Sequence, residues 1–356
     1  MKSIALLVLL YSTATSASAA ALFSPNDPDS LQNLALAARK ANYAGTFVYQ
    51  SGDRMEISRI AHFSDDTGEY SRLERLDGPR REIVRRNNET WCYLGERRVR
   101  VDLSQSEREF PDMLPKQLAL MKENYTVSGG EESRVAGFPV RAILFRPKDD
   151  LRYTHKMWAE DGSGLLLKTE VIGKRGRIIE QYTFTQLSLG DGVDRQWVEE
   201  SMPDAAGKRD AGQAKRNARS APSDAGKPPP EMPAGPDPHM TGHMPMMGKP
   251  VPVVSGWQVS GLPSGFKKIT EVRRKLPGKD APVVQLVFSD GLAGISVFIE
   301  KIGSDADTDD REGLSSQGLI QAYGKLVGDY LVTVIGEVPP RTVMQVADSV
   351  RNTDSK

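Results

Sequence analysis

The 356-residue sequence predicts a mainly β protein of the α+β class, organised in two domains. Residues 42–94 alternate apolar or aromatic with polar side chains between Gly/Asp turns, which is typical of successive antiparallel strands. Residues 201–252 are rich in Pro, Gly, Ala and Met and show almost no periodicity, so we expect a flexible linker. Strand patterns then return and end in a helix with one apolar face. The expected divisions are a signal peptide at 1–20, a domain at 21–200, the linker, and a smaller α+β domain at 253–352.

The first twenty residues have the pattern of a cleaved export signal. Lys2 precedes a short apolar run, and small residues lead to Ala17-Ser18-Ala19. The apolar run is too short to span a bilayer, so we expect export to the periplasm. Lys plus Arg and Asp plus Glu both number 47, and this balance, with export, argues against a nucleic-acid partner. The single cysteine, Cys92, lies in a strand pattern, where we expect it to be buried.

The first domain is predicted to open with a helix and to continue as an extended antiparallel sheet. Asp27 is a suitable N-cap, Pro28 suits the first helical position, and Leu31, Leu34, Ala35 and Ala38 then form one apolar face. A second, short helix is expected at 114–122. Strands are expected at 45–50, 55–62, 69–76, 81–86, 90–94, 97–103, 140–146, 151–159, 165–172 and 177–186. Two helices of modest length are the available cover for one face of this sheet.

The second domain is predicted to be a compact α+β unit. Strands are expected at 266–276, 283–288, 295–301 and 325–335, with Ser289-Asp290-Gly291 in a hairpin turn. Pro339-Pro340 opens a helix whose buried face consists of Val343, Val346, Ala347 and Val350.

The sequence places no nucleophile, base and orienting acid together, so we expect no enzyme. His62 and His155 lie on predicted strands without a serine and an acid at recognisable spacing, and a hydrolase that uses either remains a third hypothesis. The linker segment from His239 to Met247 carries the soft ligands that Cu(I) prefers, yet a metal-free linker is the favoured interpretation. The acidic run at 305–310 lacks the glycine and glutamate of a calcium loop. We therefore expect neither a metal nor a cofactor.

Two surface features of the predicted sheet have open interpretations. Nine arginines and five acids lie between Arg72 and Arg100, and they suit either an ordinary charged surface or contacts to phosphates or carboxylates. Aromatic side chains at alternating positions suit either a filled core or a concave apolar cavity for acyl chains. The cavity candidates are Phe47, Tyr49, Trp91, Tyr93 and Trp158.

Six segments resemble the MucB/RseB family of periplasmic regulators of the envelope-stress sigma factor. In the first domain they are NYAGTFVYQSGDRMEISRIAH (from Asn42), LDGPRREIVRRNNE (from Leu76) and MWAEDGSGLLLKTEVIGKRGRIIEQYTF (from Met157). In the second domain they include GWQVSGLPSGF (from Gly256), VFSDGLAGISVFIEK (from Val287) and VTVIGEVPPRTVMQVADSV (from Val332). The order is that of the family, over nearly the whole mature chain. The linker departs from the family pattern because it is longer and richer in Met and His.

The resemblance implies a fold and a partner. The fold is an unclosed antiparallel β-barrel around helices, like the lipoprotein carriers LolA and LolB, followed by a smaller domain. The partner is the periplasmic segment of a membrane-spanning anti-sigma factor, which the family shields from a site-1 protease until lipopolysaccharide or a lipoprotein signals release. The runner-up function is a LolA-like carrier of lipid or lipoprotein. A homo-oligomer is compatible with either function.

The strongest family matches supply the residues that we expect to contact the partner. One set is the turn Leu76, Asp77, Gly78, Pro79, Arg80 and Arg81, and the other is the hairpin Ser289, Asp290, Gly291 and Leu292. The competing interpretation is that these Asp-Gly turns serve backbone geometry alone.

Overall fold

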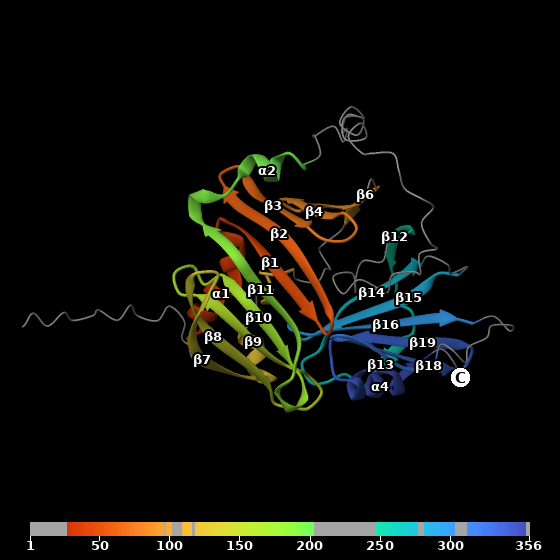
Figure 1. The fold of residues 1–356 in the computed structure, drawn as a ribbon. Coiled ribbons are helices and arrows are strands. Elements are labelled where there is room, and N and C mark those ends of the chain that lie inside the picture. Colours follow the sequence, from red (N-terminus) through yellow and green to blue (C-terminus); the bar gives the residue numbers. More distant parts are fainter. Residues whose placement is uncertain are drawn as a thin grey trace, which may run out of the picture.

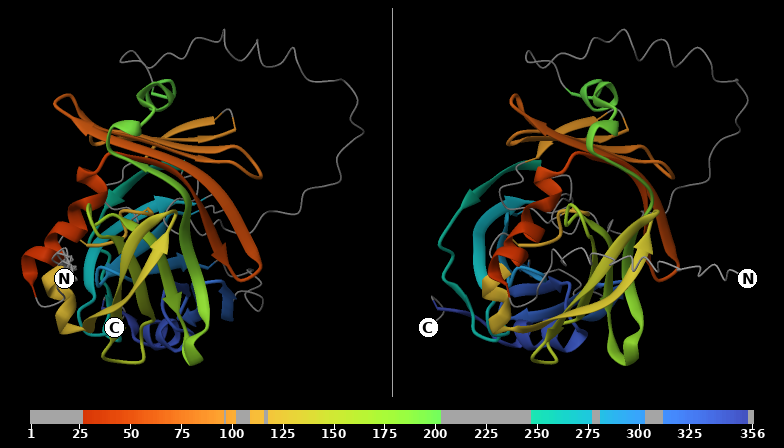
Figure 2. Two further views of the ribbon diagram at one scale, coloured as in Figure 1. Left: turned by 60° about the vertical axis from the view of Figure 1, so that its left-hand side comes forward. Right: turned by 90° about the vertical axis from the view of Figure 1, so that its left-hand side faces the viewer.

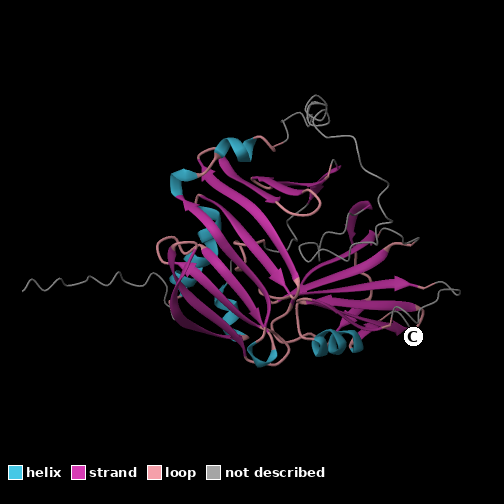
Figure 3. Ribbon diagram, in the orientation of Figure 1, coloured by secondary structure: helices cyan, strands magenta, loops and turns pink. Residues whose placement is uncertain are grey.

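The computed structural model describes residues 27–95, 97–101, 109–115, 118–202, 247–276, 281–302 and 312–353. Strands dominate both parts of the chain, and the helices are few and short (Figure 3). This confirms the predicted mainly β, α+β class. The predicted signal peptide, most of the linker, including His239 to Met246, and the acidic run at 305–310 lie outside the described residues.

The first part of the chain forms one antiparallel sheet of 11 strands, in the order β6-β5-β4-β3-β2-β1-β11-β10-β9-β8-β7. Each half of the sheet is a meander, and β1 and β11 join the two halves. The strands are β1 (Tyr43–Ser51), β2 (Arg54–Asp65), β3 (Gly68–Arg75), β4 (Arg81–Arg86), β5 (Glu89–Leu94), β6 (Arg97–Val101), β7 (Tyr125–Val135), β8 (Phe138–Pro147), β9 (Thr154–Glu160), β10 (Leu166–Ile172) and β11 (Ile178–Leu189). Figure 2 shows this sheet curving around helix α1 (Pro28–Lys40).

Helix α1 begins as predicted and packs on the concave face of the sheet. The carboxylate of Asp27 accepts hydrogen bonds from the backbone N–H of Asp29 at 3.1 Å and of Ser30 at 3.2 Å, which satisfies two of the free donors at the helix start. The predicted apolar residues of α1 are all buried. Leu31, Leu34 and Ala35 pack among side chains of β8, β9 and β10. The helix therefore occupies the concave side, and we call the opposite side the outer face.

The second part forms an antiparallel sheet of 7 strands, in the order β12-β14-β15-β16-β19-β18-β17, with a separate two-stranded ribbon β13-β20. Its strands are β12 (Met247–Pro252), β13 (Trp257–Val259), β14 (Lys267–Lys275), β15 (Val283–Ser289), β16 (Gly294–Lys301), β17 (Gly313–Gln317), β18 (Ile320–Val327), β19 (Tyr330–Gly336) and β20 (Val350–Asn352). Helix α4 (Pro340–Asp348) begins at the predicted proline and buries Val343, Val346 and Ala347 against the sheet. Figure 1 places this sheet beside the ends of β1, β2 and β11.

Three predicted elements differ from the structure. The single strand expected at 325–335 is a hairpin of β18 and β19, because Gly328 adopts a φ of 57° and turns the chain. The strand expected at 151–159 begins only at Thr154, since the preceding residues contact the second domain. The helix expected at 114–122 is a 3₁₀ helix at Leu118–Glu123, called η2.

The sequence analysis missed several elements: the short strands β13, β17 and β20, and also β7, α2 and β12. Strand β7 is mostly polar and exposed, so it lacks the alternation that identifies strands. Helix α2 (Arg195–Glu199) has only 5 residues, too few for a helical period. Strand β12 begins at Met247, inside the segment that the sequence predicts as linker, and pairs with β14.

Candidate functional site

The turn between β3 and β4 is exposed, as a partner-binding loop requires. Leu76 is 52% exposed, and the side chain of Arg80 is 58% exposed while it pairs with Glu82 at 3.3 Å. Asp77 has a structural role, because its carboxylate accepts a hydrogen bond from the Ile57 N–H at 3.0 Å. Gly78 adopts a φ of 67°, which only glycine adopts readily. The turn thus combines fixed backbone geometry with a solvent-facing leucine and arginine.

Leu76 lies at one end of a row of side chains that crosses the outer face. The backbone N–H of Leu76 donates to the Ile57 carbonyl at 2.8 Å, and each following residue pairs directly with the next across adjacent strands. Directly paired residues project to the same side of a sheet. We call this set the outer-face row: Leu76, Ile57, Val48, Thr183, Lys168 and Trp158. Met55 lies two residues from Ile57 on the same side and is 61% exposed, so apolar surface is available beside Leu76.

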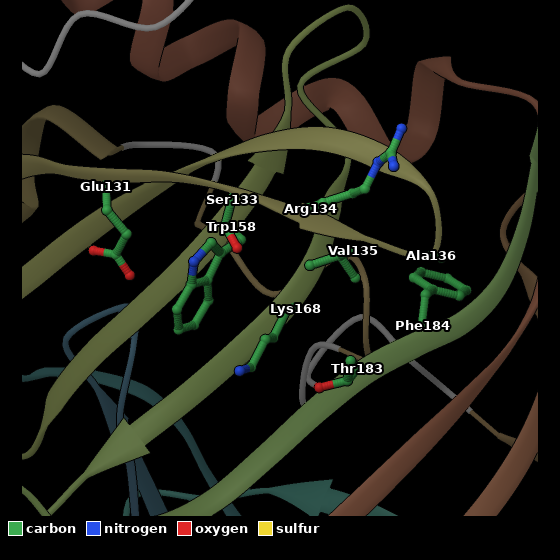
Figure 4. A pocket seen from close by; sticks show the side chains of 9 residues that line it. All are labelled: Glu131, Ser133, Arg134, Val135, Ala136, Trp158, Lys168, Thr183 and Phe184. Atoms are coloured by element: carbon green, nitrogen blue, oxygen red, sulfur yellow. The ribbon is translucent and has the colours of Figure 1, made fainter.

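A pocket of about 380 Å³ lies at the other end of the outer-face row. Figure 4 shows Lys168 and Thr183 projecting from neighbouring strands on the side that also carries the Trp158 ring, while Arg134 points away. The Nζ atoms of Lys156 and Lys168 lie 4.7 Å and 4.5 Å from the Trp158 ring centroid, within cation–π range. The lining residues are Glu131, Ser133, Arg134, Val135, Ala136, Trp158, Lys168, Thr183 and Phe184.

The two ammonium groups beside the Trp158 ring are paired with carboxylates. Lys156 pairs with Glu131 at 2.5 Å, and Lys168 pairs with Glu170 at 2.8 Å. Each ammonium already has a carboxylate, and Trp158 beneath them is only 5% exposed, so the pocket offers mainly polar hydrogen-bonding groups. This lining suits a polar side chain of a peptide.

The five cavity candidates do not share one face. Phe47 and Tyr49 project to the α1 side, where the Phe47 ring lies 5.1 Å from Phe110 and 5.9 Å from Phe184. Both residues are buried, and side chains fill this side around them. The register of the strands places Trp91, Tyr93 and Trp158 on the outer face. The expectation of one aromatic-lined concavity therefore does not describe the arrangement: alternation within a strand does not reveal which side two distant strands share.

The arginine-rich segment between Arg72 and Arg100, which we call the arginine run, attaches helix α2 to the outer face. Arg72 is buried, its Nε lies 3.1 Å from Glu82, and its Nη1 donates to the carbonyl oxygen of Trp197 at 2.7 Å. The guanidinium groups of Arg59 and Arg72 lie 4.0 Å and 4.2 Å from the Trp197 ring centroid. Part of the run is thus neither solvated surface nor an anion site, but an attachment for the last helix before residue 203.

The hairpin Ser289–Leu292 lies at the junction between the two parts of the chain. Asp290 is buried against Arg152 and Tyr125, which belong to the first part. Leu292 packs against the apolar cluster beneath α1. The structure does not bring this hairpin into the same environment as the exposed turn at Leu76. Arg152 is a residue that sequence analysis missed, because its partner is 138 positions away.

Neither strand histidine forms part of a catalytic arrangement. His62 is buried, stacks on Tyr43 with ring centroids 5.2 Å apart, and its Nδ1 lies 2.8 Å from the Ala41 carbonyl oxygen. His155 is buried near Asp290, and burial lowers its pKa to about 4, an effect that the nearby carboxylate only partly offsets. Both side chains therefore have structural roles, and the Nε2 of His62 also lies 3.4 Å from Glu69.

Two further properties bear on function. Among the residues that the structure describes, no group of three or more His, Cys, Asp or Glu side chains is placed to hold a metal ion. In the same residues, no helix is both long and apolar enough to cross a membrane.

Comparison with known proteins identifies the two parts of the chain. Residues 27–202 match the model of the MucB/RseB N-terminal domain, and residues 252–351 match the model of the MucB/RseB C-terminal domain. The sigma factor AlgU regulatory protein MucB of Pseudomonas aeruginosa is 30% identical over 327 residues, which cover 91% of this chain and 90% of that protein. The sigma-E factor regulatory protein RseB of Escherichia coli K12 is 23% identical over 325 residues, which cover 90% of this chain and 89% of RseB.

Solved structures agree with the sequence comparison. The crystal structure of MucB in complex with MucA(peri) has a TM-score of 0.66 and 25% identity, and covers 91% of this chain and 98% of that one. The complex of Pseudomonas aeruginosa MucA and MucB has a TM-score of 0.66 and 26% identity, with the same coverage. The chain belongs to the MucB/RseB family, which is a family of sigma-factor regulatory proteins and not of enzymes.

Proposed function

We propose that this protein is a periplasmic negative regulator of sigma-E signalling that binds the periplasmic segment of a membrane-spanning anti-sigma factor. One observation carries the proposal: MucB, which shares the fold over 91% of this chain, has been solved in complex with MucA(peri). A bound segment is denied to the site-1 protease, because a protease needs its substrate free and extended. Lipopolysaccharide or a lipoprotein then releases the segment, provided that it binds the partner-free state more tightly.

The outer-face row is the surface that we propose for the partner. It joins exposed apolar side chains at Leu76 and Met55 to the polar pocket beside Trp158, so an extended peptide would find apolar contacts at one end and hydrogen-bonding groups at the other. Side chains of a bound strand that alternate between surface and solvent make such contacts. The Leu76–Arg81 turn belongs to this surface. The Ser289–Leu292 hairpin lies at the domain junction, where it would act on the partner through the arrangement of the domains.

A LolA-like carrier is the alternative function, and the packing favours the regulator. A carrier would hold acyl chains in the concavity that bears Phe47 and Tyr49. In the structure, α1 and the Phe110, Tyr182 and Phe184 rings occupy that side. Native mass spectrometry of the purified protein distinguishes the two functions: stoichiometric lipoprotein, with no effect on proteolysis of the anti-sigma segment, would support the carrier.

Protease protection tests the proposal directly. The periplasmic segment of the anti-sigma factor from the same bacterium is digested by the site-1 protease with and without this protein. We expect the cleavage rate to fall as the protein is added, and to recover when lipopolysaccharide is included. A cleavage rate that does not depend on this protein at saturating concentration would refute the regulator. If the protein protects the segment but lipopolysaccharide does not restore cleavage, only the release step is refuted.

A further inference from the structure

We propose that Arg152 and Asp290 form a latch that fixes the orientation of the two domains. Arg152 lies between β8 and β9, and Asp290 lies between β15 and β16, so their ion pair joins the two sheets. The Arg152 Nε lies 2.6 Å from Asp290 Oδ2, and both side chains are 0% exposed. The proposal concerns domain orientation and holds whether or not the protein binds an anti-sigma factor.

The second domain supplies much of the environment of Arg152. Its guanidinium donates to the carbonyl oxygen of Ser264 and lies 5.1 Å from the Phe266 ring centroid. From its own domain it pairs with Asp149 and lies 5.7 Å from the Tyr125 ring centroid. If the domains separated, the guanidinium would lose the Asp290 and Ser264 contacts together. Asp149 would remain its partner, but the Asp290 and Ser264 acceptors reach the guanidinium only in the orientation seen here.

Asp290 is held rigidly in place to receive the arginine. Its Oδ1 accepts hydrogen bonds from the backbone N–H of Leu292 at 3.0 Å and of Ala293 at 2.9 Å, which fixes the carboxylate within its own turn. Its Oδ2 accepts from Arg152 and from the Tyr125 hydroxyl, which lies 2.9 Å away. One carboxylate oxygen thus stabilises the hairpin, and the other makes the contact between domains. Because the turn is fixed in advance, closure orders few further groups.

Because a buried ion pair holds this junction, a ligand can readily shift the ratio of its closed and open arrangements. Water solvates both charges when the domains part, so the pair itself contributes little net free energy to closure, unlike an apolar core. Among the described residues, the apolar clusters that cross the junction are small: Leu319 packs against Tyr153 and Val171, and Leu292 packs beneath α1. Closed and open arrangements then differ modestly in free energy, and a ligand with unequal affinity for the two can shift their ratio.

Substitution of one partner has a different effect from substitution of both. Asp290→Asn keeps the oxygen that caps the turn but removes the buried charge opposite Arg152, leaving the buried guanidinium with Asp149 as its only carboxylate among the described residues in the closed state. We expect the open-to-closed ratio to rise about 100-fold. Asp290→Asn combined with Arg152→Met removes both charges and restores the closed state. A solvent-exposed ion pair across the same junction, Arg341–Asp150, with side chains 51% and 67% exposed, supplies the matched control Arg341→Gln.

Electron–electron distance measurement on the full chain tests the latch. Spin labels are placed on the exposed residues Asn88 and Gln258 through cysteine substitutions, in a Cys92→Ala background. We expect one dominant distance for the unsubstituted latch and for Arg341→Gln, a second or broadened distance for Asp290→Asn, and one distance again for the double variant. An Asp290→Asn distribution identical to that of the parent would overturn the proposal, as would an equal change in Arg341→Gln.

A milder variant covers the case in which Asp290→Asn does not fold. Tyr125→Phe removes only the hydroxyl that donates to Asp290 and keeps the ring that packs in the core. We expect it to fold and to show a smaller shift of the same sign, about tenfold in the open-to-closed ratio. A distribution unchanged from the parent in folded Tyr125→Phe, together with an unfolded Asp290→Asn, would make the carboxylate a folding determinant and overturn the latch.

Discussion

The guanidinium of Arg72 lies over the ring of Trp197, 4.2 Å from its centroid, and its Nη1 donates to the Trp197 carbonyl oxygen at 2.7 Å. Arg59 contacts the same ring at 4.0 Å. Val198, the next residue of α2, is buried against Ala61 and Phe63. These contacts attach the end of the first domain to the outer face of β2 and β3. The position at which the chain leaves this domain is therefore fixed by the arginine-rich sheet.

Replacing Trp197 with alanine should destabilise the first domain. The change removes two cation–π contacts and a half-buried indole, for an expected loss of about 2 kcal/mol in the free energy of unfolding. Urea denaturation followed by circular dichroism measures the loss. Gln196→Ala is the matched control, since this exposed side chain donates a hydrogen bond to Glu200 at the end of the same short helix, and it should change the free energy by less than about 0.5 kcal/mol. Equal effects of the two substitutions would show that the stacking contributes nothing specific.

Gly318 and Gly328 form a natural pair for testing the domain junction. Their φ angles are 59° and 57°, so alanine costs similar backbone strain at both positions. A Cβ on Gly318 would overlap the hydroxyl of Ser51 in the first domain, whereas one on Gly328 would meet no atom within 4 Å. We expect Gly318→Ala to lower the melting temperature more than Gly328→Ala, by the equivalent of about 1–2 kcal/mol.

A second substitution isolates the steric part of this effect. Ser51→Ala removes the overlapping hydroxyl, so Gly318→Ala in that background should cost no more than Gly328→Ala. Differential scanning calorimetry of the natural protein, Gly318→Ala, Ser51→Ala and the double variant completes the double-mutant cycle. If Ser51→Ala gives no rescue, the contact between the β1–β2 hairpin and the β17–β18 turn does not exist in solution.

His155 makes stability depend on pH in the mildly acidic range. Its pKa is lowered from 6.5 to about 4 by burial, so the unfolded chain binds its proton more readily than the folded one. Stability from the neutral imidazole is thus fully present above pH 6.5 and is lost as the pH falls toward 4. Between pH 7 and pH 5, the loss of this stabilisation lowers the free energy of unfolding by about 2 kcal/mol.

The variant His155→Gln removes that titration. Its free energy of unfolding in urea, measured at pH 7 and pH 5, should fall by about 2 kcal/mol less than that of the natural protein over the same interval. His62→Gln is a comparison at the other buried histidine. A pH dependence that is the same with and without His155 would place the titrating group elsewhere.

Most helices and strands of this fold were predicted from patterns within short segments. The candidate site depends instead on contacts between residues that are distant in the sequence. Helix α1 follows from Asp27, Pro28 and four apolar residues, all within one short segment. The side of the sheet that Trp158 shares with Leu76 depends on the register of six strands, which no single segment encodes. The contact of Asp290 with Arg152 spans 138 positions and depends on how the domains dock. The hairpin was found by sequence, but its burial at the junction was not.

Leu76 allows a direct test of the proposed partner surface. Because it is 52% exposed, Leu76→Glu should leave the free energy of unfolding within about 0.5 kcal/mol of its original value. If the outer-face row holds the anti-sigma segment, a carboxylate at its apolar end should weaken binding at least tenfold, or by about 1.4 kcal/mol. Isothermal titration calorimetry with the periplasmic segment measures both affinity and stoichiometry.

Val254 supplies the control for this substitution. It is 97% exposed and lies in the second domain, away from the outer-face row, so Val254→Glu adds the same charge to the protein without altering the row. We expect its affinity to match that of the natural protein. Binding that is weakened by Val254→Glu and not by Leu76→Glu would move the partner surface to the second domain, while the regulatory function would still stand. Unaltered binding in both variants would instead exclude apolar contact at either position.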